Sequence, residues 1–130
     1  MAKQMSVERP GRSRPLLVAL AITALTAALL VALAVFVMAQ GHGRFSLGVG
    51  AALLGYGALV AAIAWLGWKR HPLGYGPLVG VTLLHGCVVA STAWGSQAWW
   101  LWFGLLPALV AIVCLLAPVV REEFGRTGAR

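Results

Sequence analysis

Four long apolar segments separated by short loops take up most of this chain, and none of them contains Lys, Arg, Asp or Glu. The segments cover about residues 15–40, 47–68, 72–94 and 98–120. A helix rises about 1.5 Å per residue, so about 20 residues cross a hydrocarbon core of roughly 30 Å. Each segment is long enough to span a bilayer, whereas a membrane strand would show about ten residues of alternating polarity.

Composition and loop length predict the fold class. Hydrophobic residues make up 61% of the chain and charged residues 10%, against about 45–50% and about 25% in soluble domains. Short loops make consecutive helices antiparallel neighbours. We therefore predict an all-α membrane protein with four transmembrane helices in an up-down antiparallel bundle, embedded in the lipid bilayer.

The first segment has a rival interpretation as a cleavable signal peptide, because basic residues precede it. Its apolar run exceeds the roughly 7–15 residues of such a signal, and no clean small-x-small exit follows. We predict a retained helix.

The basic residues predict the orientation. With the N-terminus in the cytoplasm, Arg44 is the one outward basic residue, and the inner side holds Lys3, Arg9, Arg12, Arg14, Lys69, Arg70, Arg121, Arg126 and Arg130. Cytoplasmic loops carry such an excess of Lys and Arg. We expect a multi-pass protein of the bacterial plasma membrane, with a basic N-terminal tail (1–14), a transmembrane domain (15–120) and a C-terminal tail (121–130), both tails cytoplasmic and mobile.

The net charge of +7 would ordinarily suggest nucleic-acid binding. The basic residues lie at segment ends, however, where they meet phospholipid headgroups. We expect anionic lipid at the basic tails and no nucleic-acid partner.

Aromatic residues gather at the segment ends. Trp94, Trp99, Trp100, Trp102 and Phe103 lie at the outer ends, and Trp65, Trp68 and Tyr75 lie at the inner ends. Indole rings favour the headgroup level, where the ring is half buried and the N–H stays hydrated. The pattern predicts membrane-interface belts; the alternative for the outer tryptophans is a ligand-binding aromatic box.

Small residues indicate where helices pack. One face of the second segment carries Ala51, Gly55, Ala58 and Ala62, and the third carries a GxxxG pair, Gly76 and Gly80. Small side chains let helices approach closely in lipid. These faces either join the second and third helices within one chain, or join the chain to a second copy or to another membrane helix.

The polar residues inside the membrane are few. Tyr56, His85 and Pro107 are expected at a similar depth, where proline also frees the carbonyl of Phe103 from its helical hydrogen bond. We predict one hydrogen-bonded cluster containing these groups. It is either a structural histidine satisfied by a neighbour, or a proton relay, gate or ligand contact. The threonine hydroxyls are expected to donate to carbonyls one turn back.

No catalytic residue, cofactor or metal site is predicted. His85 and Cys87 point about 200° apart around a helix, so they cannot bind one ion together. The carboxylates are Glu8, Glu122 and Glu123, all in the tails. The components of general acid–base chemistry are missing from the membrane segments, which predicts that the chain is not an enzyme.

Four short helices in this length resemble the small multidrug resistance transporters, but the membrane-embedded Glu of that family's first helix is replaced here by apolar residues and threonines. Over most of its length the chain is similar to uncharacterised small four-helix integral membrane proteins of high-GC actinobacteria. The resemblance rests on the basic N-terminus, on Trp68-Lys69-Arg70-His71-Pro72 and on Leu115-Leu116-Ala117-Pro118-Val119-Val120-Arg121. It implies location and topology alone.

Two functions are compatible with these features. The first is a non-enzymatic accessory or oligomer-forming subunit whose partner is another membrane helix or a second copy. The alternative is a small transporter or channel subunit that works as an oligomer around Tyr56 and His85.

Overall fold

The computed structural model describes residues 11–41, 43–96 and 99–128. The predicted all-α class is confirmed, and the described part of the chain contains no strand. The elements, in chain order, are α1 (Arg14–Ala39), α2 (Arg44–Trp68), a 3₁₀ turn η1 (Pro72–Gly74), α3 (Tyr75–Ser96), a second 3₁₀ segment η2 (Trp99–Gly104), α4 (Leu105–Leu116) and α5 (Pro118–Gly128). Four stretches are long and apolar enough to cross a membrane: Arg14–Ala39, Arg44–Trp68, Pro72–Gly95 and Trp99–Leu116.

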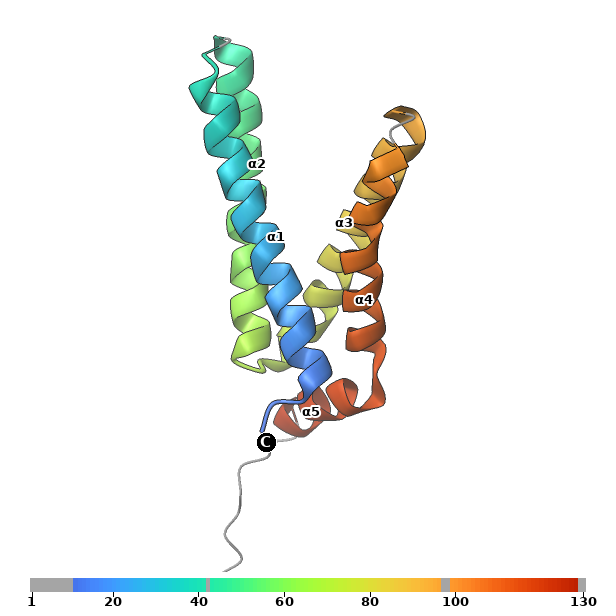
Figure 1. Ribbon diagram of the computed structural model, residues 1–130. Helices are drawn as coiled ribbons and strands as arrows, with labels where there is room; N and C mark the ends of the chain where they lie inside the picture. The colour runs from blue at the N-terminus through green and yellow to red at the C-terminus, as the bar shows by residue number, and fades with distance from the viewer. Residues whose placement is uncertain (1–10, 42, 97–98, 129–130) are drawn as a thin grey trace, which may run out of the picture.

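The spanning helices form two antiparallel hairpins, α1 with α2 and α3 with α4, that meet at one end and diverge toward the other (Figure 1). We call the end that holds α5 the inner end and the opposite end the outer end. Helix α1 packs along α2 and also against α4, whereas α2 and α3 have little contact. The four helices therefore make a V that is closed at the inner end.

Helices α1 and α2 pack through buried residues at seven-residue intervals, most of them Ala or Gly. The buried positions in this repeat are Leu20, Ala27 and Ala34 on α1, and Gly50, Gly57 and Ala64 on α2. A period of seven residues keeps one helix face against its partner. A Cβ atom added to Gly57 would lie 3.1 Å from Val31 Cγ2, so the two backbones approach closely there.

The hydrophobic core lies near the inner end, where all five α-helices meet. Its buried residues are Leu16, Ala19, Leu20, Ile63, Leu78, Leu115, Val120 and Phe124. Tyr75, Val79, Val81, Cys114 and Ala117 pack around them.

The predicted boundaries hold for the first three segments but not for the fourth. The expected helix of residues 98–120 ends at Leu116, because Ala117 is extended (ψ 134°) and Pro118 has no N–H to continue the helix. Most of the expected C-terminal tail (121–130) belongs to α5, which packs its buried Val120 and Phe124 into the core. The expectation of a mobile tail is therefore wrong as far as Gly128; most of the N-terminal tail (1–10) lies outside the described residues.

Candidate functional site

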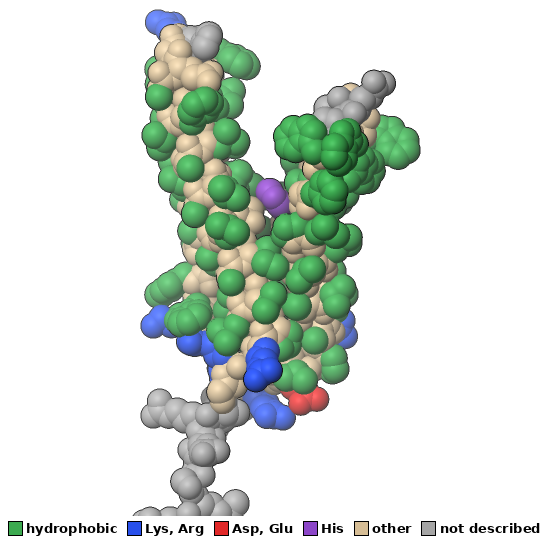
Figure 2. Space-filling view, viewed as in Figure 1, with side chains coloured by type: hydrophobic (Ala, Val, Ile, Leu, Met, Phe, Trp, Pro, Cys, Tyr) green, Lys and Arg blue, Asp and Glu red, His purple; other side chains and the backbone are tan. Residues whose placement is uncertain are grey.

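A hollow of about 250 Å³ lies between the two hairpins. The space-filling view shows the opening between the two arms (Figure 2). Its lining comes from α1 (Ile22, Thr23, Leu25, Thr26, Leu29), from α2 (Val60), from α3 (Val81, Thr82, His85, Val89) and from η2 and α4 (Gly104, Pro107, Ala108). The structure thus brings His85 and Pro107, two of the three predicted cluster residues, to one space.

Tyr56 does not join them. It lies on α2 outside the hollow and is partly exposed. Within the described residues, neither Tyr56 nor His85 makes a side-chain hydrogen bond, and none reaches the carbonyl of Phe103. The predicted hydrogen-bonded cluster is therefore not formed among the residues that the structure describes. Similar depth did not bring α2 and α3 together, because α1 packs on α2 and the hairpins diverge.

Three threonines of the hollow satisfy their own hydroxyl hydrogens, as predicted. Thr23 Oγ1 donates to the carbonyl of Ala19 (2.8 Å), Thr26 Oγ1 donates to that of Ile22 (2.9 Å), and Thr82 Oγ1 donates to that of Leu78 (2.7 Å). The His85 imidazole also lines the hollow, and it makes no hydrogen bond to any residue that the structure describes.

The two predicted small-residue faces do not pack on each other. Ala51, Gly55, Ala58 and Ala62 on α2 are exposed, and so are Gly76 and Gly80 on α3. A Cβ atom added to any of these three glycines would meet nothing within 4 Å. The interpretation as a contact within one chain is therefore wrong, because α2 packs on α1 through its opposite face. The interpretation as an interface with another chain stays a prediction.

The outer aromatic residues are exposed at the ends of α3 and η2. Trp94 is 81% exposed and Trp99 is 73% exposed. They form edge-to-face pairs, Trp94 with Trp102 (ring centroids 6.4 Å apart) and Trp99 with Phe103 (5.9 Å). Exposure of this degree is typical of rings at a membrane interface and unlike a closed aromatic box.

A polar cluster at the inner end was not predicted from the sequence. The Glu123 carboxylate accepts hydrogen bonds from the backbone N–H of Ser13 (3.0 Å) and from its hydroxyl (2.8 Å), and it pairs with Arg70 Nη2 at 3.9 Å. We call Ser13, Arg70 and Glu123 the inner polar cluster. It joins the start of α1, the loop after α2 and α5. The Glu123 side chain is 13% exposed, whereas that of Glu122 is 65% exposed and pairs with Arg126 one turn along.

The backbone of Arg70 is part of this arrangement. Its N–H donates to the carbonyl of Gly67 (3.0 Å), and the next N–H, from His71, donates to that of Leu66 (3.1 Å). This Schellman pattern places residue 70 in the left-handed region, at φ 54°, where glycine is usual. The left-handed region costs about 1–2 kcal/mol for a residue with a Cβ atom. From this backbone position the Arg70 side chain reaches Glu123.

Tyr75 links α3 to the break between α4 and α5. Its hydroxyl donates to the carbonyl of Leu115 (2.9 Å), and its ring contacts Phe124 with centroids 5.4 Å apart. The helix break at Ala117 and Pro118 leaves that carbonyl without its normal partner. The sequence indicated an interface aromatic residue here, but the acceptor lies 40 residues away and was not predictable.

Among the described residues, no group of three or more His, Cys, Asp or Glu side chains is arranged to hold a metal ion. Cys87 and Cys114 are free thiols. Comparison of the chain with protein-family models, with curated proteins and with solved structures finds no match.

Proposed function

We propose that this chain is a non-enzymatic accessory or oligomer-forming subunit of the bacterial plasma membrane, and that it binds other membrane helices. The observation that carries the proposal is the exposed small-residue face of α2, with Gly55 at its centre and no neighbour within 4 Å of an added Cβ atom. Lipid tails provide no hydrophobic drive for helix association, so such faces favour close packing against another helix.

The charge distribution supports an orientation with both termini in the cytoplasm. Lys69, Arg70, Arg121 and Arg126 lie at the inner end, whereas Arg44 begins α2 at the outer end. Figure 2 shows the blue Lys and Arg side chains gathered mainly near α5. The test is labelling of Arg44→Cys in intact cells with a membrane-impermeant thiol reagent, in a chain whose two native cysteines are replaced. Labelling is expected for this variant and not for Arg121→Cys; the reverse pattern would invert the topology.

Assembly is tested by purifying the protein from native membranes in a mild detergent and measuring its native mass. We expect either a homo-oligomer or a stoichiometric membrane partner. The double variant Gly55→Leu/Gly80→Leu should lose the associated chains, because leucine prevents close approach of another helix. It should keep its own fold, because an added Cβ atom meets nothing at either position.

The matched control is Val113→Phe, which adds bulk to α4 at a residue that is 69% exposed. This variant should assemble like the unmodified protein. A bare monomer before any substitution, or equal assembly of the double variant and the unmodified protein, would contradict the proposal.

A small transporter or channel subunit is the second candidate, supported by the hollow that reaches His85. An unpaired polar side chain facing a membrane-level cavity is typical of substrate pathways. The test is flux into proteoliposomes that contain the purified protein or the His85→Ala variant. Flux that depends on His85 would favour this candidate; absence of flux in both would exclude it for the substrates assayed.

A further inference from the structure

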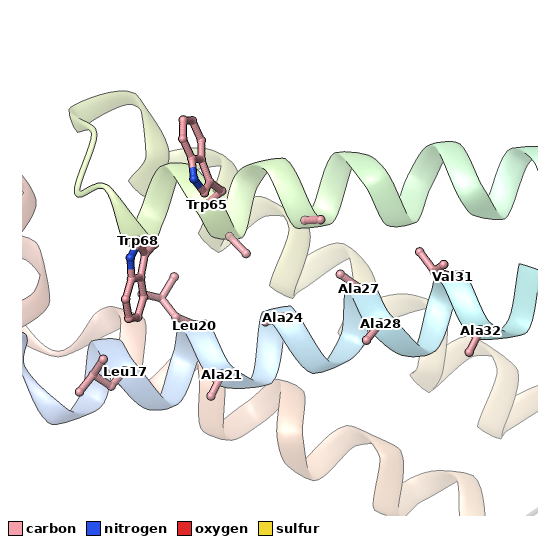
Figure 3. Close-up of a pocket in the computed structure, with 12 residues that line it drawn as sticks. Leu17, Leu20, Ala21, Ala24, Ala27, Ala28, Val31, Ala32, Trp65 and Trp68 are labelled. Carbon is pink, nitrogen blue, oxygen red and sulfur yellow. The ribbon is translucent and has the colours of Figure 1, made fainter.

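A groove of about 1000 Å³ runs along the surface of the α1–α2 hairpin (Figure 3). Its walls are mainly alanine: Ala21, Ala24, Ala27, Ala28 and Ala32 from α1, and Ala61 and Ala64 from α2. Trp65 and Trp68 line its inner end. Between Leu17 and Ala32 the groove follows α1 for about 22 Å, compared with about 15 Å for the hydrocarbon of one leaflet. It is long enough for an acyl chain.

A basic side chain lies over the ring of each of the two tryptophans. The guanidinium of Arg12 lies 3.5 Å from the ring centroid of Trp68, and its Nη2–H donates a hydrogen bond to the carbonyl of Trp68 (3.3 Å). Lys69 Nζ lies 5.5 Å from the ring centroid of Trp65. Positive charge therefore lies where the groove reaches the inner surface.

The charge of Arg12 is not balanced by the described residues. Its Nε is buried and has no hydrogen-bond partner, and neither Arg12 nor Lys69 pairs with a carboxylate in the part of the chain that the structure describes. Basic side chains at the cytoplasmic surface of a membrane attract anionic lipid headgroups. An anion at the end of the groove would balance the charge of Arg12.

We propose that this groove binds one anionic phospholipid of the cytoplasmic leaflet, with an acyl chain along the alanines and the phosphate at Arg12 and Lys69. Groove length, chemistry of the walls, headgroup-level tryptophans and charge sign favour this occupant. The choice of leaflet rests on the proposed orientation. The inference holds whether or not the chain assembles, because every lining residue belongs to one hairpin.

The first test uses native mass spectrometry of the full-length protein in detergent, titrated with phosphatidylglycerol or phosphatidylcholine of identical acyl chains. One phosphatidylglycerol should be retained per chain in preference to phosphatidylcholine. The double variant Arg12→Gln/Lys69→Gln should lower the phosphatidylglycerol affinity about thirtyfold, from the usual contribution of two basic residues at an anionic surface.

The matched control, Arg121→Gln/Arg126→Gln, removes the same charge from α5, outside the groove, and should leave the affinity nearly unchanged. Equal retention of the two lipids, or equal losses in the two double variants, would overturn the proposal in favour of diffuse surface attraction.

A second test leaves the charges in place. Ala28→Leu fills the groove and should weaken binding of phosphatidylglycerol, whereas Ala52→Leu, at an exposed alanine of α2 outside the groove, should not. If the Arg12→Gln/Lys69→Gln variant fails to fold, the comparison of these two alanine variants still tests whether the groove binds lipid. Unchanged binding of phosphatidylglycerol in Ala28→Leu would overturn the proposal. If that variant also lost a second copy of the chain from its native mass, the groove would be an interface between copies.

Discussion

The inner and outer halves of this molecule are built from the same four helices but are held together differently. At the inner end five α-helices share one hydrophobic core, and the inner polar cluster and Tyr75 connect distant segments. At the outer end the hairpins diverge, and His85, which lines the hollow between them, makes no hydrogen bond within the described part of the chain. The single chain therefore joins its two hairpins at the inner end and leaves them apart at the outer end.

The largest test of this comparison is Leu115→Ala in the core. Leu115 is fully buried, and replacing a buried leucine with alanine costs about 2–5 kcal/mol. We expect the lower part of that range, because the unfolded side chain stays in an apolar micelle. The measurement is the free energy of unfolding in mixed micelles. Leu106→Ala, on the same helix but 55% exposed, is the control; equal losses would show that the inner core is not special.

A second test removes one charge from the inner polar cluster. Glu123→Gln weakens the acceptor of the two Ser13 hydrogen bonds and the partner of Arg70, so we expect a loss of about 1.5–3 kcal/mol in unfolding free energy. Protease cleavage within α5 should also become faster. The adjacent Glu122→Gln breaks an exposed pair within one helix and should cost about 0.5 kcal/mol or less. Equal losses of unfolding free energy in the two variants would show that the inner polar cluster does not hold α5 against the core.

Tyr75→Phe tests a single hydrogen bond at the inner end, from the Tyr75 hydroxyl to the carbonyl of Leu115. The variant keeps the ring contact with Phe124 but leaves the carbonyl of Leu115 without its donor, at an expected cost of about 1 kcal/mol. Tyr56→Phe removes a hydroxyl that has no hydrogen bond within the described chain and should leave unfolding unchanged. The same micelle assay applies to both, and an equal loss for the two tyrosines would contradict this assignment.

The smallest stability effect is expected in the hollow. His85→Leu removes no hydrogen bond among the described residues and should change the free energy of unfolding of the purified single chain by less than about 0.5 kcal/mol. A loss above about 1 kcal/mol would reveal a partner for the imidazole and would make the outer half more like the inner half.

The four spans could be predicted from the sequence because each is long, apolar and free of charge. The threonine hydrogen bonds were predictable for a local reason, since their acceptors lie one turn away. The choice of packing face was not. Helix α2 has small residues on two sides, and the Gly50, Gly57 and Ala64 repeat fits the shape of α1, which the sequence of α2 does not contain.

Helix α5 and the inner polar cluster were missed for a different reason. Residues 121–126 are mostly polar, which favoured a tail, although Val120 and Phe124 have the spacing of one apolar helix face. Ser13 and Glu123 are 110 residues apart, and no local pattern links them. The predicted cluster of Tyr56 and His85 was wrong for a related reason. The two residues were expected at a similar depth, but depth alone does not show which helices are neighbours.

The contact between Ser13 and Glu123 also sets an order of events during biogenesis. Ser13, the N-cap of α1, is synthesised before the four spanning segments, and its acceptor Glu123 is synthesised after them. Until α5 docks, the Arg70 loop lacks its carboxylate and the inner core lacks Val120 and Phe124. Closure of the inner end is therefore a long-range step that requires α5 to have been synthesised.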